Sequence, residues 1–134
     1  MNQTDLSLEE IYRVNRFEFA NGNWFSLENM SYATKFTTPL LIITGFNPNN
    51  SNMSDEYNKE ANDRLRLELD SLGYKHIDCI GGCFGHYEDS FCVFDINLEE
   101  SIKLGAKYGQ YSIFFVSSGG LGHYYKVDTE ELIV

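Results

Sequence analysis

The segment HIDCIGGCFGHYEDSFC, which begins at His76, contains the three cysteines of the chain and two of its three histidines. Zinc is bound by Cys and His ligands in close pairs such as C-x2-C, and a structural ion needs four of them. Here Cys79, Cys83 and Cys92 are separated by longer gaps, with His86 between the last two. Alternate side chains of a strand face opposite sides, so His76 and Cys79 would point apart. The sequence therefore predicts no metal ion.

Cys83 could instead act as a nucleophile, with His86 or His123 as its base. A thiol becomes reactive where positive neighbours or a helix N-terminus lower its pKa. The neighbours of Cys83 along the chain include Glu88 and Asp89, which are negative. A catalytic thiolate is therefore not favoured.

Two glycine-rich pieces, GGCFG and SSGGLG, suggest phosphate-binding loops at first sight. Neither has the G-x-x-x-x-G-K-[ST] signature, and neither leads into a predicted helix. Turn glycines explain them better, so we expect no cofactor.

A second group of side chains is suited to binding a polar ligand. Asn58 and Asn62 are four residues apart on a predicted helix, and Glu88 and Ser90 are two apart on a predicted strand, so each pair shares a face. Amides donate and accept hydrogen bonds and suit recognition of a base, amide or sugar. The same residues could instead form a buried polar network that ties loops to a sheet. The candidate ligand-binding residues are Asn47, Asn58, Asn62, His86, Ser90 and Gln110, and Glu88 is the candidate general base.

Capping and periodicity predict the helices that must position these residues. Ser7 and Glu10 have capping-box spacing and predict a helix over 8–17. Ser54 caps a long helix that ends at Gly73, with Tyr57, Ala61, Leu65, Leu69 and Leu72 as its buried stripe. Asn97 caps another helix, which ends at Gly109.

Short apolar, β-branched runs between these helices predict the strands. The run LLIIT fits a strand buried on both faces. A strand near 32–37 is a weaker prediction. The further strands are expected over 40–44, 74–80, 90–95, 111–116 and 123–127.

This order predicts an α/β (α+β) fold with helices packed on a mixed sheet. From residue 40 onward it reads β-α-β-β-α-β, the ferredoxin-like order, with an N-terminal helix and a C-terminal hairpin strand added. We expect a single domain over 1–134, with its core over 40–127.

Composition limits the classes of partner. The 134 residues carry 20 acidic and 10 basic side chains, a net charge of −10, which makes binding to nucleic acid unlikely. The N-terminus has no secretory signal pattern, and the longest apolar stretch is too short to span a membrane. With an odd number of cysteines, these features favour a cytoplasmic protein with reduced thiols.

Four short motifs occur in a definite order: TGFNP at 44–48, NKEANDRL at 58–65, EDSF at 88–91 and YGQYSIF at 108–114. In order and spacing they resemble those of a bacterial family, the domain of unknown function 3293. The resemblance covers about residues 40–116 and implies a site without implying a reaction. The matching polar positions are Asn47, Asn58, Asn62, Glu88, Ser90 and Gln110.

Two functions are compatible with these observations. The first is binding of a small polar ligand, for example a nucleotide-like one, through the Asn/Gln/Glu cluster, with Glu88 as general base if a reaction follows. The second is an acidic, non-catalytic interaction module of the inhibitor or immunity type. It would bind a basic protein through its charge and through Trp24, Tyr124 and Tyr125, which we expect to be exposed.

Overall fold

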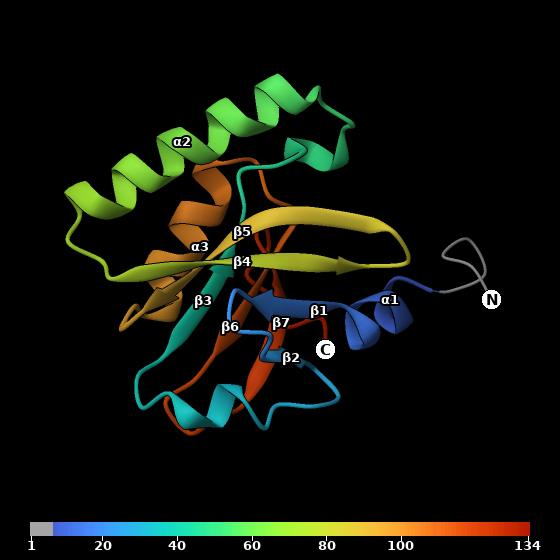
Figure 1. Ribbon diagram of the computed structural model, residues 1–134, viewed down its shortest axis with the longest axis vertical. Helices are drawn as coiled ribbons and strands as arrows, with labels where there is room; N and C mark the ends of the chain where they lie inside the picture. Colours follow the sequence, from blue (N-terminus) through green and yellow to red (C-terminus); the bar gives the residue numbers. More distant parts are fainter. Residues whose placement is uncertain (1–6) are drawn as a thin grey trace.

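A single sheet of seven strands carries the fold, in the spatial order β2-β1-β4-β5-β3-β6-β7 (Figure 1). The structure is a computed structural model and describes residues 7–134, except for the side chain of Asn50. The strands are β1 Arg16–Phe19, β2 Trp24–Ser26, β3 Leu40–Ile43, β4 His76–Cys83, β5 His86–Phe94, β6 Ser112–Val116 and β7 Gly122–Lys126. The helices are α1 Leu8–Val14, α2 Asp55–Ser71 and α3 Leu98–Lys107, with short 3-10 helices η2 Ala33–Lys35 and η3 Pro48–Asn50.

All neighbouring strands are antiparallel, so the mixed sheet expected from the sequence is wrong. Strands β3 and β4 are connected through α2 and run in the same direction. They are not neighbours, because β5 lies between them and pairs with both. The α/β class itself is confirmed, since α2 and α3 connect strands of this one sheet.

The curled sheet has a separate core on each face. Helices α2 and α3 pack on one face, against side chains such as Leu41 and Ile43. The concave face carries Phe17, Ile42 and Phe114, and residues of α1 and of the C-terminus pack against it. Because side chains alternate along β3, its four apolar residues supply both cores and all are buried.

Local sequence signals predict the two long helices correctly. The side chains of Ser54 and Asn97 each accept a hydrogen bond from a backbone N–H three residues further on, at the start of α2 and α3. The strands predicted over 40–44, 111–116 and 123–127 are confirmed as β3, β6 and β7. Within the part of the chain that the structure describes, no helix is both long and apolar enough to cross a membrane.

The N-terminal part differs most from the prediction. The expected helix over 8–17 ends at Val14, and the next residues form β1. The alternating sequence RFEF buries two phenylalanines of β1 on the concave face, where β1 pairs with β4. The strand expected over 32–37 is wrong, because the chain forms η2 there and its aromatic residues pack individually onto the concave core.

The two strands predicted on either side of GGCFG belong to one longer hairpin, β4–β5 (Figure 1). Gly81 and Gly82 continue β4 and do not end it. The turn lies at Phe84 and Gly85, which both have positive φ, as a tight hairpin turn requires. Glycine is needed at position 82 because the backbone and ring of Tyr87 on β5 occupy the space of a Cβ.

The buried stripe of α2 also departs from the prediction. Tyr57 and Leu72 were expected inside, but 37% and 55% of their surfaces are exposed. Asn58 and Asn62 are buried in this face of the helix. The N-terminal half of α2 packs on the polar loop over 44–53, where hydrogen bonds replace apolar contacts.

Candidate functional site

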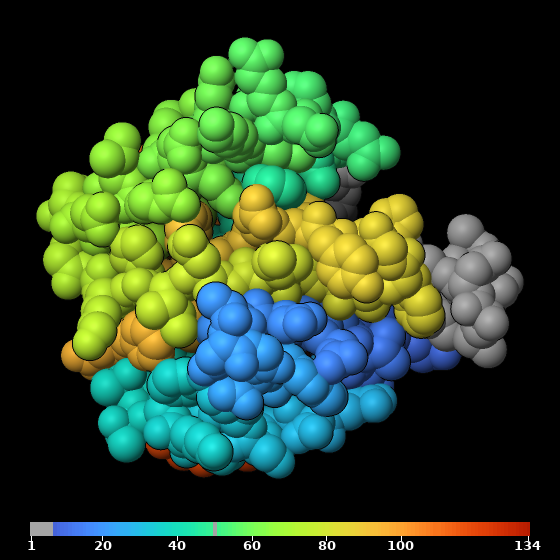
Figure 2. All heavy atoms as spheres, viewed as in Figure 1, coloured from blue at the N-terminus to red at the C-terminus, as the bar shows by residue number. Residues whose placement is uncertain are grey.

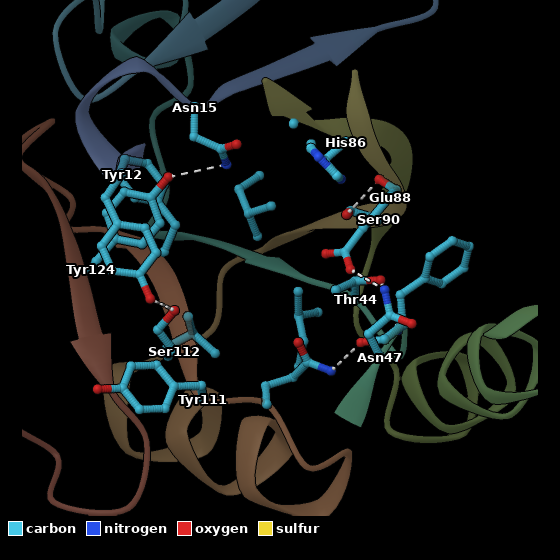
Figure 3. Close-up of a pocket in the computed structure, with 18 of the residues that line it drawn as sticks. Tyr12, Asn15, Thr44, Asn47, His86, Glu88, Ser90, Tyr111, Ser112 and Tyr124 are labelled. Atoms are coloured by element: carbon cyan, nitrogen blue, oxygen red, sulfur yellow. Dashed lines mark hydrogen bonds between the residues drawn. The ribbon is translucent and has the colours of Figure 1, made fainter. Parts of the chain in front are cut away.

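A cavity of about 460 Å³ opens on the concave side of the sheet (Figure 3). Strand β5 and the loop after β3 form one wall, and α1 with β6 and β7 forms the opposite wall. The floor includes Ile42 and Phe114 from the central strands. Its size is in the range of small-molecule sites.

Glu88 is the only carboxylate among the described residues that line the cavity. Its Oε2 accepts a hydrogen bond of 3.0 Å from Nδ2 of Asn47. Among the groups that the structure describes, none donates a hydrogen bond to Oε1 and no basic side chain forms an ion pair with Glu88. Burial raises the pKa of Glu88, and the hydrogen bond from Asn47 opposes this only in part.

Ser90 lies two residues further along β5, on the same face as Glu88, as the strand alternation predicts (Figure 3). It is buried, and its Oγ donates to the backbone carbonyl of Glu88 at 3.1 Å. Gly81 lies on β4 opposite Glu88, and an added Cβ there would be 3.6 Å from the Oγ of Ser90 and 3.2 Å from the ring of Phe17. The missing side chain at Gly81 therefore leaves space beside Ser90.

The loop after β3 holds Asn47 in a left-handed conformation, with φ of 48°. Oδ1 of Asn58 accepts from the backbone N–H of Asn47 at 2.8 Å, and Nδ2 of Asn58 donates to Oδ1 of Asn47 at 3.0 Å. Oδ1 of Asn47 also accepts from the N–H of Met53. This clamp leaves Nδ2 of Asn47 directed at Glu88.

Asn62 fixes the start of the same loop. Its Oδ1 accepts from the N–H of Gly45 at 2.6 Å, and its Nδ2 donates to the carbonyl of Asp89 at 2.8 Å. Oγ1 of Thr44 donates to the same carbonyl at 2.7 Å. Asn62 therefore joins α2, the loop and β5, and it does not line the cavity.

Gln110 attaches the loop from the other side. Its Nε2 donates to the carbonyls of Phe46 and Tyr108, at 3.1 and 3.2 Å. The preceding Gly109 has φ of +67° and lies so close to Pro48 that an added Cβ would be 2.7 Å from the Cβ of Pro48. The carbonyl oxygen of Gly109 accepts a hydrogen bond of 2.7 Å from the backbone N–H of Asn49. The four sequence motifs therefore converge on one loop.

The opposite wall is built around two stacked tyrosines, Tyr12 of α1 and Tyr124 of β7, whose ring centroids are 4.2 Å apart (Figure 3). The hydroxyl groups of Tyr12 and Ser112 hydrogen-bond at 2.8 Å, and Nδ2 of Asn15 donates to the hydroxyl of Tyr124 at 3.4 Å. Burial raises the pKa of both tyrosines, so both are neutral at physiological pH. This pair faces Glu88 and Asn47 across the cavity.

None of the candidate ligand-binding residues named from the sequence lies on this second wall. One signal was available, because Leu8, Ile11, Tyr12 and Asn15 follow the i, i+3, i+4, i+7 spacing of one helix face, and all four line the cavity. Tyr124, which the sequence predicts to be exposed, is buried, with 4% of its surface exposed. Trp24 and Tyr125, also predicted to be exposed, are half-buried. Arg16 lies over the ring of Trp24, 3.6 Å from the centroid, so that ring is not an open surface.

The candidate residues thus separate into two groups. Asn58 and Asn62 are buried and bind only protein groups, away from the cavity. The other candidates line the cavity, with His86 exposed at its rim (Figure 3). These lining residues are Asn47, His86, Glu88, Ser90 and Gln110.

The cysteines lie in different environments. Cys79 and Cys92 are buried in the concave core, and burial raises the pKa of Cys92 to about 12 and that of Cys79 further. His76 contacts Asp70 instead, with 2.8 Å between its Nε2 and the carboxylate. Cys83 lines the cavity, and burial raises the pKa of its thiol. Among the described residues, no three His, Cys, Asp or Glu side chains come together as a metal site.

Comparison with known proteins identifies a family. The sequence model of the family described as "Protein of unknown function (DUF3293)" matches residues 43–113, just over half of the chain. This span contains the loop, α2, the β4–β5 hairpin and Gln110. No curated protein and no solved structure matches the chain. The chain belongs to this family.

Proposed function

We propose that this member of the family binds a small polar ligand in the cavity between β5 and the stacked tyrosines. The observation that carries the proposal is the half-buried carboxylate of Glu88, which keeps one oxygen without a donor and faces the cavity. Oε1 of Glu88 is not among the fully buried atoms that lack a partner, so it is accessible from the cavity and can accept a hydrogen bond from a ligand.

The surrounding side chains are suited to orient such a ligand. Asn47 holds Oε2 of Glu88, which leaves Oε1 as the acceptor for the ligand. Oε1 of Gln110 and Oδ1 of Asn15 have no donor among the described residues and supply further acceptors. Aromatic rings on the opposite wall supply apolar contact, and this mixture of apolar surface with a few polar groups is typical of ligand pockets.

We also propose Glu88 as the general base if the bound ligand reacts. A base works best when its pKa is close to the working pH, and burial moves the pKa of Glu88 in that direction. The cavity places no second carboxylate beside it among residues 7–134, so Glu88 would act alone.

Native mass spectrometry of the freshly purified protein tests ligand binding directly. We expect a co-purified small molecule that is lost in Glu88→Gln and retained in Glu60→Gln. Glu60 is the matched control because it is an exposed glutamate on α2 outside the cavity. The proposal fails if folded Glu88→Gln keeps the ligand and any turnover of the wild-type protein.

A second candidate function, binding of a basic protein, is favoured by one surface. Ile80, Phe84 and Tyr87 on the β4–β5 hairpin are 47%, 45% and 61% exposed, next to the carboxylates of Glu18 and Asp89. The hairpin surface runs between α2 and β1 (Figure 2). Charge reversal of these two carboxylates should abolish capture of a partner, and capture that persists at high salt would exclude an electrostatic mechanism.

For the fold, we propose that β3-α2-β4-β5-α3-β6 forms the ferredoxin-like unit predicted from the sequence. The neighbouring order β4-β5-β3-β6 supports this, with β1, β2 and β7 added at the edges. A crystal structure with a different order of these four strands would refute it.

A further inference from the structure

The side chains that line the cavity have an unusual balance of charge. Among the described residues, neither Lys nor Arg contributes to the lining, although the chain has ten of them. Proteins hold phosphate groups with basic side chains or with backbone N–H groups at the start of a helix. No Lys or Arg lies beside Glu88, and His86 at the rim is the one histidine in the described lining. A ligand with a phosphate would bring its negative charge towards this unpaired carboxylate.

The available hydrogen-bonding atoms are mainly acceptors. Among the described residues, Oε1 of Glu88, Oε1 of Gln110 and Oδ1 of Asn15 accept no hydrogen bond, whereas the amide nitrogens of Asn15, Asn47 and Gln110 already donate to protein groups. The fourth amide of the lining, Asn52, is exposed. The Ser90 hydroxyl also donates within the protein. A ligand that pairs with these three acceptors must therefore supply N–H or O–H donors.

Aromatic rings surround these acceptors. Tyr12, Phe46, Tyr87, Tyr111 and Tyr124 all line the cavity. The face of an aromatic ring attracts a positive charge, and this attraction is stronger where water is excluded. Several aromatic rings together with one carboxylate form a site that favours a cation over a neutral molecule of the same shape.

Resting on the proposed function, we propose that the ligand is a small organic cation, an amine, amidine or guanidine, that carries no phosphate. Its N–H groups donate to Oε1 of Glu88 and to the free amide oxygens, and its apolar part packs on the tyrosines. The positive charge of the ligand provides the counter-charge to Glu88 that no Lys or Arg of the lining supplies. The amides in the sequence suggested a nucleotide-like ligand. The proposed ligand can resemble the base of a nucleotide but carries no phosphate.

Three probes of nearly equal size separate charge from shape: benzamidine is a cation, benzamide is neutral and benzoate is an anion. Titration calorimetry with the full chain should show benzamidine binding at least about tenfold more tightly than benzamide, because a charge-assisted hydrogen bond is about twice as strong as a neutral one. Benzoate should not bind at millimolar concentration, and neither should AMP, which serves as a fourth probe that carries a phosphate. In Glu88→Gln the preference for benzamidine should disappear, and in Glu60→Gln it should remain.

Each other outcome overturns the inference. Benzamide equal to benzamidine would remove the role of charge, and binding of benzoate or AMP would show a site for anions. Failure of all the probes would exclude a general cation site. The proposed function is judged separately, because a neutral or anionic molecule that co-purifies with the wild-type chain and is lost in Glu88→Gln would support the cavity while refuting the cation.

Discussion

Replacing Asn58 with alanine should destabilise the protein without removing any group that faces the cavity. Asn58 is 4% exposed and makes two hydrogen bonds to Asn47, of 2.8 and 3.0 Å. At about 1 kcal/mol each, their loss costs about 2 kcal/mol, and the N–H of Asn47 left without a partner adds about 1 kcal/mol. Alanine is the better helix former and returns about 0.6 kcal/mol. The net loss is therefore about 2 kcal/mol.

Urea denaturation and thermal unfolding of Asn58→Ala measure this loss. For 134 residues the entropy of unfolding at the midpoint is about 0.28 kcal/mol/K, so about 2 kcal/mol corresponds to a decrease in Tm of about 7 °C. Lys59→Ala is the matched control, because Lys59 is the next residue of α2, is exposed and should change stability by less than about 0.5 kcal/mol.

Hydrogen exchange gives a second measurement at the same place. The backbone N–H of Asn47 is protected in the wild-type protein because it donates to Asn58, and Asn58→Ala should remove this protection. The reasoning is refuted if Asn58→Ala unfolds like Lys59→Ala and keeps the Asn47 amide protected. The clamp would then not depend on the Asn58 side chain.

Three further predictions follow from the same structure. The pKa of Glu88 is higher in the folded state than in the unfolded state, so the folded state binds this proton more tightly and stability falls as the pH rises through the folded pKa. Glu88→Gln should therefore be more stable than wild type at neutral pH. Denaturation at a series of pH values should show this difference vanishing below the unfolded pKa. Gly109→Ala should lose more stability than Gly73→Ala, about 3 against about 1 kcal/mol, because both have positive φ but only Gly109 would place its Cβ against Pro48. A thiol reagent should modify only Cys83 in the native protein and all the cysteines after unfolding, and rapid native modification of a second thiol would contradict the burial described above.

The elements that the sequence predicted correctly are those specified by short-range rules. The caps at Ser54 and Asn97 act over three residues, and the apolar run of β3 is buried on both faces, so both patterns are visible without knowing the neighbours. Strand β1 depends on its pairing with β4, whose residues lie at least 60 positions away from their partners, and its alternation RFEF directly follows the predicted helix. Residues 32–37 have the composition of a strand but no neighbouring strand to pair with.

The candidate site was predictable only in part, for a similar reason. The wall with Asn47 and Glu88 was found because its residues lie in short motifs. The wall with Tyr12 and Tyr124 joins residues more than 100 positions apart, and no local pattern connects them. Burial of Asn58 could not be predicted either, because a polar residue on a helix is exposed unless a loop elsewhere supplies its partners.

The hydrogen bonds themselves separate structure from binding within the family motifs. Asn58 and Asn62 use both their amide oxygen and their amide nitrogen on the loop and on β5, so neither has a free group to offer a ligand. Gln110 uses only its nitrogen and Glu88 only one oxygen, so each keeps a free acceptor where it lines the cavity. Substitutions in the first pair should therefore lower stability, whereas Glu88→Gln should lower affinity without lowering stability. If Glu88→Gln and Asn58→Ala reduced both stability and affinity to the same extent, the loop and the cavity would be one unit, and the structural and binding roles could not be separated.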